Sequence, residues 1–288
     1  MSDRFSICGF TLLTTPFEQQ LAAVAGAGGY GVCEALIPEG MAPAEVRAAL
    51  DRSGLRATIC LPALLAPLPL PRFEGPEDPE ERIAGLQASV RLLAPLEPEM
   101  MVILTGPPGD REPEEARAVA LDGIARVNDV AKAEGVRLGL EPIYRADAAD
   151  WSLVWDIPGA LALLDELGDD NIGLLLDSFH LWDTPDVEAH IRAAGPRIAG
   201  VHVNDRGADH RSWADRRIPG TGVIDLAGWL RACEDAGYAG HYDCELFSDD
   251  GTLGVADYPD SLWKQDGARL ARDCATAFDT LAGQAGIS

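Results

Sequence analysis

IGLLLD, at residues 172–177, is a run of apolar residues that ends in a carboxylate, which is the pattern of a buried strand with a functional group at its end. Three more runs in the second half of the chain end in a residue that can bind a metal: VRLGLE at 136–141, IAGVH at 198–202 and HYDCE at 241–245. Segments of helix length separate the four runs. The sequence therefore indicates one site that is built from the ends of successive strands.

Alternation within these runs strengthens this interpretation. Side chains two positions apart share one face of a strand, so Asp177 lies with Gly173, whereas Leu174 and Leu176 lie on the opposite face. The runs at 136–141 and 198–202 also place a glycine on the face of the final polar residue. We expect the apolar faces to pack on helices. The faces with glycines and polar ends are expected to line the inside of a curved sheet.

Strand-like and helix-like segments alternate eight times along the 288 residues. This alternation predicts a parallel sheet, and eight units in a chain of this length predict an α/β fold of the (β/α)8 or TIM barrel type, as a single domain over residues 1–288. An open doubly wound sheet usually has a glycine-rich loop after its first strand, but residues 11–16 read TLLTTP. Helix-like segments end at glycines just before a strand, at Gly54, Gly135, Gly195 and Gly237.

Composition excludes several classes of function. The chain has 23 Lys and Arg against 47 Asp and Glu, a net charge of −24, which disfavours nucleic-acid binding. No apolar run approaches the ~20 residues of a membrane span, and the first residues do not read as a signal peptide. The six cysteines are scattered without close pairs, as is typical of buried thiols in a reducing compartment. We therefore expect a cytoplasmic protein with a small-molecule substrate and no nucleic-acid or membrane partner.

The four polar strand ends form a candidate metal site. Three carboxylates and one imidazole are hard, oxygen-rich ligands that suit one divalent ion, with Mn²⁺ preferred and Mg²⁺, Co²⁺ or Zn²⁺ as alternatives. The loops that follow strands are long and those that precede them are short, which places an active site at the carboxyl ends of the barrel strands. The proposed metal ligands are Glu141, Asp177, His202 and Glu245.

The chain resembles the xylose-isomerase-like barrels of sugar and sugar-phosphate isomerases and epimerases over essentially its whole length. That family includes ketose 3-epimerases and hydroxypyruvate isomerases, with relatives among inosose dehydratases, inosose isomerases and a DNA-repair endonuclease. The resemblance is strongest in four segments: LEP at 140–142, LLLDSFH at 174–180, VHVND at 201–205 and DRRIPGTGVID at 215–225.

The resemblance implies further site residues. The four ligands would hold one divalent ion, and His180 and Arg216 would bind substrate oxygens. Arg217 is the next candidate if the register of its loop differs. Glu34 matches a position at the end of the second strand that is often acidic in the family.

The chemistry follows from the residue types. A divalent ion that bridges a carbonyl oxygen and a neighbouring hydroxyl stabilises the enediolate that forms when the α proton is removed. Glu141 and Glu245, from the fifth and eighth strands, would flank the metal and act as the catalytic acid and base. Return of the proton to the other face gives epimerisation, return to the neighbouring carbon gives isomerisation, and loss of a β substituent gives elimination.

The leading hypothesis is a metal-dependent isomerase or epimerase of a sugar, keto-sugar or related polyol. The alternative is a lyase on the same scaffold, either an inosose dehydratase or an enzyme that eliminates the aglycone from a 3-keto-glycoside, possibly with a partner subunit. A DNA-repair endonuclease would need three zinc ions and extra histidines, and this chain has no histidine before His180. An inactive barrel that serves as a subunit, and a homo-oligomer, are the remaining possibilities.

Overall fold

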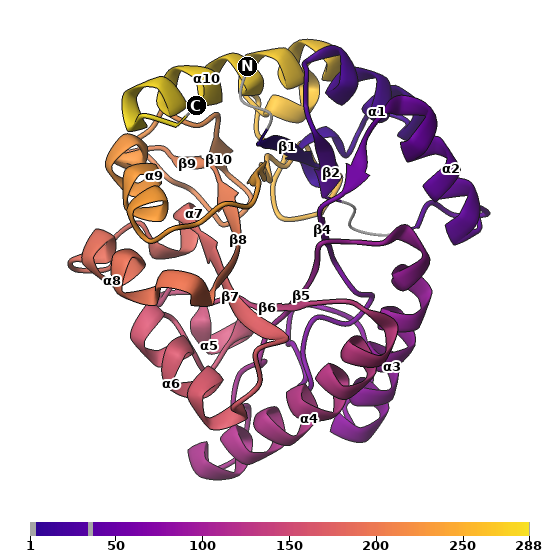
Figure 1. The fold of residues 1–288 in the computed structure, drawn as a ribbon, viewed down its shortest axis with the longest axis vertical. Helices are drawn as coiled ribbons and strands as arrows, with labels where there is room; N and C mark the ends of the chain where they lie inside the picture. The colour runs from indigo at the N-terminus through magenta and orange to yellow at the C-terminus, as the bar shows by residue number, and fades with distance from the viewer. Residues whose placement is uncertain (1–3, 34–36, 288) are drawn as a thin grey trace.

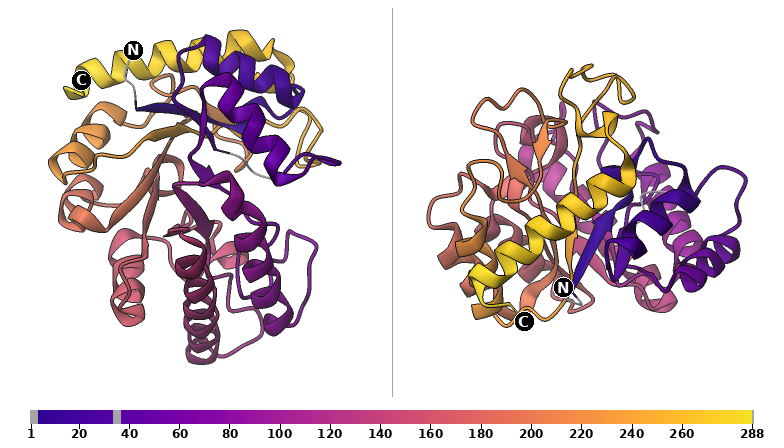
Figure 2. Two further views of the ribbon diagram at one scale, coloured as in Figure 1. Left: turned by 45° about the vertical axis from the view of Figure 1, so that its right-hand side comes forward. Right: turned by 90° about the horizontal axis from the view of Figure 1, so that it is seen from above.

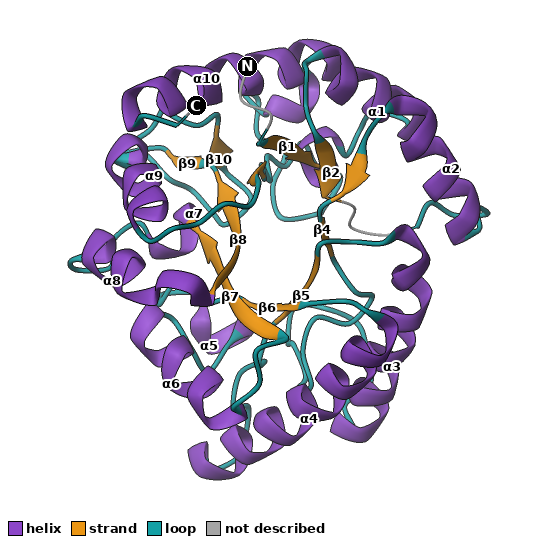
Figure 3. Cartoon of the chain, viewed as in Figure 1, coloured by secondary structure: helices purple, strands orange, loops and turns teal. Residues whose placement is uncertain are grey.

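Parallel strands form a ring at the centre of the molecule, and helices surround it (Figures 1 and 3). The computed structural model describes residues 4–33 and 37–287. The strands of the main sheet, in their order around it, are β3 (Arg56–Ala57), β2 (Gly31–Cys33), β1 (Phe5–Cys8), β11 (Tyr242–Cys244), β8 (Ile198–Val203), β7 (Ile172–Asp177), β6 (Leu138–Leu140), β5 (Met100–Ile103) and β4 (Ile59–Cys60). Neighbouring strands in the sheet are parallel.

The sheet closes on itself at Thr58. This residue separates β3 from β4, which are consecutive parts of one strand. Its backbone N–H donates to Val32 O at 3.0 Å on one side, and its carbonyl accepts from Met100 N at 3.1 Å on the other. Within the described residues the barrel therefore consists of eight strands, and the predicted TIM barrel is confirmed.

The helices lie around the ring. They are α1 (Phe17–Gly26), α2 (Pro43–Ser53), α3 (Pro79–Leu93), α4 (Pro113–Glu134), α5 (Ala148–Trp151), α6 (Ile157–Leu167), α7 (Ser178–Leu181), α8 (Val187–Ala194), α9 (Leu226–Asp235) and α10 (Gly267–Ala285). Two short ones, α5 and α7, follow strands at its mouth. Gly54 and Gly135 follow α2 and α4 with φ of 68° and 72°, a left-handed conformation that glycine adopts without steric cost. Figure 2 shows α10 beside α1, which it contacts.

Glycines make room for a core side chain inside the barrel. A Cβ atom on Gly139 would lie 2.2 Å from Met100 Sδ, and one on Gly200 would lie 2.3 Å from Met100 Cε. Leu174 and Leu176 pack in the outer core that faces the helices. The predicted division of the strands into an inner glycine face and an outer apolar face is therefore confirmed.

A layer of buried polar groups crosses the barrel below the mouth. Asp243 Oδ1 accepts hydrogen bonds from Ser6 Oγ and Thr58 Oγ1, each at 2.5 Å. Asp243 lies in β11, Ser6 lies in β1, and Thr58 joins β3 to β4. One carboxylate thus connects three strands of the ring.

The first strand is short, because β1 ends at Cys8 and a 3-10 helix follows at Gly9–Leu12. Thr11 causes the turn, because its hydroxyl donates to Cys244 O at 2.8 Å and accepts from Leu246 N at 2.9 Å. As a result, Phe10 lies at the mouth of the barrel.

A short antiparallel hairpin projects beyond β8. It consists of β9 (Asp205–Arg206) and β10 (Arg216–Arg217). Asp205 anchors the segment that follows by accepting from Gly222 N and Ile224 N. No helix within the described ranges is long and apolar enough to cross a membrane.

Candidate active site

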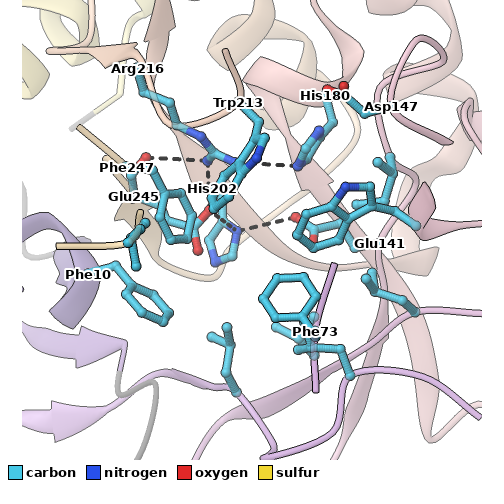
Figure 4. Close-up of a pocket in the computed structure, with 17 residues that line it drawn as sticks. Phe10, Phe73, Glu141, Asp147, His180, His202, Trp213, Arg216, Glu245 and Phe247 are labelled. Carbon is cyan, nitrogen blue, oxygen red and sulfur yellow. Dashed lines mark hydrogen bonds and ion pairs between the residues drawn. The ribbon is translucent and has the colours of Figure 1, made fainter. Parts of the chain in front are cut away.

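The four predicted metal ligands converge at the mouth of the barrel. Glu141 follows β6, Asp177 ends β7, His202 lies in β8 and Glu245 follows β11. His202 Nδ1 lies 3.5 Å from the nearest carboxylate oxygen of Glu141 and 3.5 Å from that of Glu245. The nearest oxygen of Asp177 is 3.9 Å from the same nitrogen. Figure 4 shows Glu141 and Glu245 on opposite sides of His202.

These side chains are chemically suited to a cation. Ligand atoms from Glu141, Asp177 and His202 all lie within 4.8 Å of one another. All four residues are buried, yet Glu141 Oε1 and both ring nitrogens of His202 have no hydrogen-bond partner. Buried polar atoms are normally paired, so these atoms are ready to bind a ligand. Three carboxylates also face one guanidinium, that of Arg216, which leaves the negative charge that a divalent cation would balance.

Asp177 is held in place by one oxygen and presents the other. Its Oδ1 accepts from Phe179 N at 2.7 Å, at the start of α7, and from Asn204 Nδ2 at 2.9 Å. Its Oδ2 faces the site and lies 2.9 Å from Arg216 Nη1. Burial alone would raise the pKa of Asp177, but Arg216 and the two histidines hold it below its usual value.

Arg216 connects the carboxylates. Its Nη1 donates to Asp177 Oδ2 and, at 2.7 Å, to Glu245 Oε2. The guanidinium carbon lies 4.7 Å from the ring centroid of Phe179 and 4.8 Å from that of Phe247. Two aromatic rings and two ion pairs therefore fix this side chain, which is 3% exposed.

The proton of His180 can be assigned from its contacts. Burial lowers the pKa of His180 to about 3, so the ring is neutral at ordinary pH. Its Nδ1 accepts from the backbone N–H of Tyr144 at 3.2 Å. A neutral imidazole carries one proton, and the Nδ1 contact places it on Nε2. Nε2 lies 3.4 Å from Arg216 Nη2, which cannot accept this proton, and 3.9 Å from Asp177 Oδ2, so the N–H can donate to an oxygen bound in the cavity that His180 lines.

The two glutamates differ in their surroundings. Burial raises the pKa of Glu141 to about 7, and the nearby His202 partly offsets this effect. Glu245 Oε1 accepts a weak hydrogen bond from Cys8 Sγ at 3.8 Å, while its Oε2 is paired with Arg216. The pKa of His202 would fall through burial, but Glu245 and Glu141 raise it well above the usual value.

Two further predicted substrate-binding residues are Glu34 and Arg217. Glu34 lies outside the described residues. Arg217 is paired with Asp260, at 3.2 Å, and with Asp215, at 3.6 Å, and it does not line the cavity. Of the two arginines in β10, Arg216 is therefore the one that lies at the candidate site.

A cavity of about 130 Å³ opens at the candidate site, where Glu141, His202 and Glu245 line it, and its walls include residues that were not predicted from the sequence. Asp147, in the loop after β6, lines it near His180 (Figure 4), and burial raises the pKa of its carboxyl group. Of the four tryptophans in the mouth loops, Trp151 and Trp213 line the cavity, whereas Trp155 and Trp182 do not. The remaining lining residues are apolar: Phe10, Leu61, Leu65, Phe73, Val102, Leu104, Ile143, Phe247 and Leu253.

Several curated proteins are similar to part of this chain. An L-ribulose 3-epimerase of Mesorhizobium japonicum is 37% identical over 126 residues, which are 43% of this chain and 39% of that protein. An inosose isomerase of Bacillus subtilis is 29% identical over 138 residues, 46% of this chain and 48% of that one. A 3-dehydroshikimate dehydratase of Pseudomonas aeruginosa is 30% identical over 46% of this chain and 21% of its own length. The chain thus spans less than half the length of these relatives.

Solved structures match the fold over nearly the whole chain. A protein of Sinorhizobium meliloti 1021 is 25% identical with a TM-score of 0.83, covering 96% of this chain and 98% of its own. The IOLI protein, crystallised with a zinc atom, has a TM-score of 0.79 at 18% identity, and the match covers 98% of this chain and 99% of that one. The model of the xylose isomerase-like TIM barrel family matches residues 20–274. The chain therefore belongs to the xylose isomerase-like TIM barrel family.

Proposed function

We propose that this protein is a divalent-metal-dependent isomerase or epimerase of a sugar, a keto-sugar or a related polyol. The observation that carries the proposal is the convergence of Glu141, Asp177, His202 and Glu245, among which Glu141 Oε1 and both ring nitrogens of His202 are buried without a hydrogen-bond partner. The relatives named as an epimerase and as an isomerase support the same class of reaction.

The proposed metal ligands are those four side chains. The oxygen-rich set favours Mn²⁺ or Mg²⁺, and Co²⁺ or Zn²⁺ would also fit. The bound ion would supply positive charge beside a substrate carbonyl, which makes the neighbouring C–H bond more acidic.

Glu141 and Glu245 would transfer the proton. They lie on opposite sides of His202, so each carboxylate could reach one face of a substrate that lies between them. Removal of a proton by one glutamate and delivery by the other inverts a carbon centre.

Two further residues would orient the substrate. His180 Nε2–H can donate to a substrate oxygen at the rim of the site. Arg216 can share its second amino group, Nη2, with an oxygen while Nη1 keeps the ion pairs with Asp177 and Glu245. Arg217 and Glu34 remain predicted substrate-binding residues.

Metal analysis joined to proton exchange tests the proposal. Purified protein should contain about one divalent ion per chain, EDTA should abolish activity, and Mn²⁺ or Co²⁺ should restore it. In D₂O, the metal-loaded protein should incorporate deuterium next to the carbonyl of a ketohexose or ketopentose. Protein that binds three metal ions, or that catalyses no exchange across such a panel, would refute the single-metal isomerase.

A lyase is the second candidate, because one of the relatives is named as a dehydratase. The same glutamates would remove the α proton, but a leaving group on the next carbon would depart before the proton returned. Elimination produces a conjugated enone that absorbs in the ultraviolet. An absorbance change during the exchange assay would therefore identify the lyase, and exchange without it would identify the isomerase or epimerase.

A further inference from the structure

Five aromatic rings form a continuous arc around the cavity. From ring to ring, the centroid distances are 4.9 Å between Phe10 and Phe247, 5.5 Å between Phe247 and Trp213, 5.8 Å between Trp213 and Trp151, and 4.8 Å between Trp151 and Phe73. The last three contacts are edge-to-face. All five side chains line the cavity, and Figure 4 labels four of them. We call these residues the aromatic arc.

The arc is assembled from segments that are far apart in the sequence. Phe10 follows β1, Phe73 lies between β4 and α3, Trp151 ends α5, Trp213 lies between β9 and β10, and Phe247 follows β11. Edge-to-face contacts stabilise such an arrangement beyond the burial of apolar area. The arc is therefore a preformed wall whose shape depends on the complete barrel.

The polar groups of the cavity are few, and one of them, Arg216, lies against the Phe247 ring of the arc. Among the described lining residues they are Glu141, Asp147, His180, His202, Arg216 and Glu245. They can satisfy the few oxygens near the candidate metal site. A free sugar carries a hydroxyl on almost every carbon, and hydroxyls turned towards the arc would find few partners there, such as the unpaired indole N–H of Trp213. Each buried hydroxyl that loses its hydrogen bonds weakens binding about tenfold or more.

The arginines at and beside the described part of the cavity already form ion pairs with carboxylates. Arg216, the arginine among the described lining residues, is already paired with Asp177 and Glu245. Arg72, near the rim, is paired with Asp150 at 2.6 Å. A phosphate or carboxylate would thus lie near the carboxyl group of Asp147 and would compete with Asp177, Glu245 and Asp150 for these guanidinium groups.

We propose that the site accepts an uncharged α-hydroxycarbonyl compound that carries an aryl group. Its oxygens would lie at the metal ligands and its aryl group against the aromatic arc. This inference rests on the proposed function for the position of the oxygens, and on the arc alone for the aryl group.

A matched pair of small probes tests the preference directly. 2-Hydroxyacetophenone and hydroxyacetone present the same adjacent carbonyl and hydroxyl, but the first carries a phenyl group and the second a methyl group. Their dissociation constants for the Mg²⁺-loaded protein can be measured by NMR titration, which requires no turnover. Burial of a phenyl ring should make the first probe bind about 10-fold to 100-fold more tightly. Equal affinity, or tighter binding of hydroxyacetone, would overturn the proposal.

Substitutions in and near the arc identify the cause of the preference. Phe73 is 42% exposed, so Phe73→Ala should fold, and it should reduce the phenyl preference about threefold to tenfold. Phe73→Leu provides a second measurement if the alanine variant melts early, with a smaller reduction expected. Trp155 is equally exposed but lies outside the cavity, and Trp155→Ala should leave the preference unchanged. A preference that survives both Phe73 variants would contradict the role of the arc.

The exchange assay and the probe titrations together distinguish a failure of this inference from a failure of the proposed function. A protein that exchanges deuterium into keto-sugars but shows no phenyl preference would keep the proposed function and refute the inference. A protein that prefers the phenyl probe but catalyses no exchange would support the arc and refute the isomerase. Glycolaldehyde phosphate, which adds an anion in place of the ring, should bind no more tightly than hydroxyacetone. Tighter binding of this phosphate would refute the uncharged substrate.

Discussion

The two halves of the barrel mouth are built from opposite kinds of residue. The ends of β6, β7, β8 and β11 supply the carboxylates and the imidazole of the candidate metal site. The apolar half consists of side chains at and after the ends of β1, β4 and β5, among them Phe10, Leu61 and Val102, together with the rings that the loops after β6, β9 and β11 add, which are Trp151, Trp213 and Phe247. This difference suggests that one half performs the chemistry and the other selects the substrate. Changes in the charged half should then affect turnover and metal binding, and changes in the apolar half should affect affinity.

The largest effect is expected where the charged half depends on one side chain. Arg216→Ala should lower the free energy of unfolding by about 3–5 kcal/mol in EDTA, because it leaves buried carboxylates without their cation. Mn²⁺ should recover part of this loss. Urea denaturation with and without Mn²⁺ measures both effects. Arg192→Ala is the control, since its ion pairs are exposed and should contribute at most about 1 kcal/mol. Equal losses in the two variants would show that Arg216 does not hold the charged half together.

Removal of a proton-transfer group should mainly slow turnover. Glu141→Gln and Glu245→Gln should each lower kcat by at least about 10², the usual scale for loss of a general acid or base. Elemental analysis must accompany the kinetics, because both residues are also proposed ligands. Glu115→Gln, on the exposed surface of α4, is the matched control and should retain full activity. Normal turnover in either active-site variant, with metal still bound, would remove that residue from the proton-transfer role.

A substitution in the apolar half should have the opposite kinetic signature. Trp151→Ala should raise KM about tenfold, or about 1.4 kcal/mol, while kcat changes little. Steady-state kinetics on the best substrate of the exchange screen would show the difference. A fall in kcat as large as that of the glutamine variants would contradict the idea that the charged half performs the chemistry and the apolar half selects the substrate.

The smallest effect is expected in the loop that brings Leu253 to the apolar side. Asp249 is buried and accepts from four backbone N–H groups, those of Gly251, Leu253, Val255 and Ala256. Burial alone would raise its pKa, but these donors lower it. The stabilisation that the Asp249 carboxylate provides is therefore complete above ~3.9, its pKa in the unfolded chain. This stabilisation is lost as the pH falls through the lower pKa of Asp249 in the folded protein.

Asp249→Asn should cost about 1 kcal/mol at neutral pH, because the amide replaces one accepting oxygen with a donor. The difference from the native protein should shrink as the pH falls below about 4. Thermal melting between pH 3 and pH 7 measures this, with the exposed Asp183→Asn as control. A constant difference across that range would show that the charge of Asp249 does not stabilise the loop.

The charged half could be predicted from the sequence and the apolar half could not, for a physical reason. Alternation along a strand is a local property, so the runs that end in Glu141 and Asp177 reveal both the inner face and the mouth. The barrel fold followed from the same signal. The aromatic arc has no local signal, because Phe73 and Trp213 lie in irregular loops whose paths depend on the completed barrel. The choice between Arg216 and Arg217 likewise depends on the register of the β9–β10 hairpin, which the sequence does not reveal. The position of Asp147 at the cavity depends on the path of the loop after β6.

The polar layer beneath the mouth has a consequence for the order in which the protein is made. Asp243 joins Ser6 and Thr58, which precede it by 237 and 185 residues. At a synthesis rate of ~5–20 residues per second, roughly ten seconds or more pass between the synthesis of these two hydroxyl groups and that of the carboxylate. Until then the ring cannot close, and the early strands expose an edge to which other chains can pair. A ribosome that stalls before residue 243 would therefore hold a nascent chain that is prone to aggregate and dependent on chaperones.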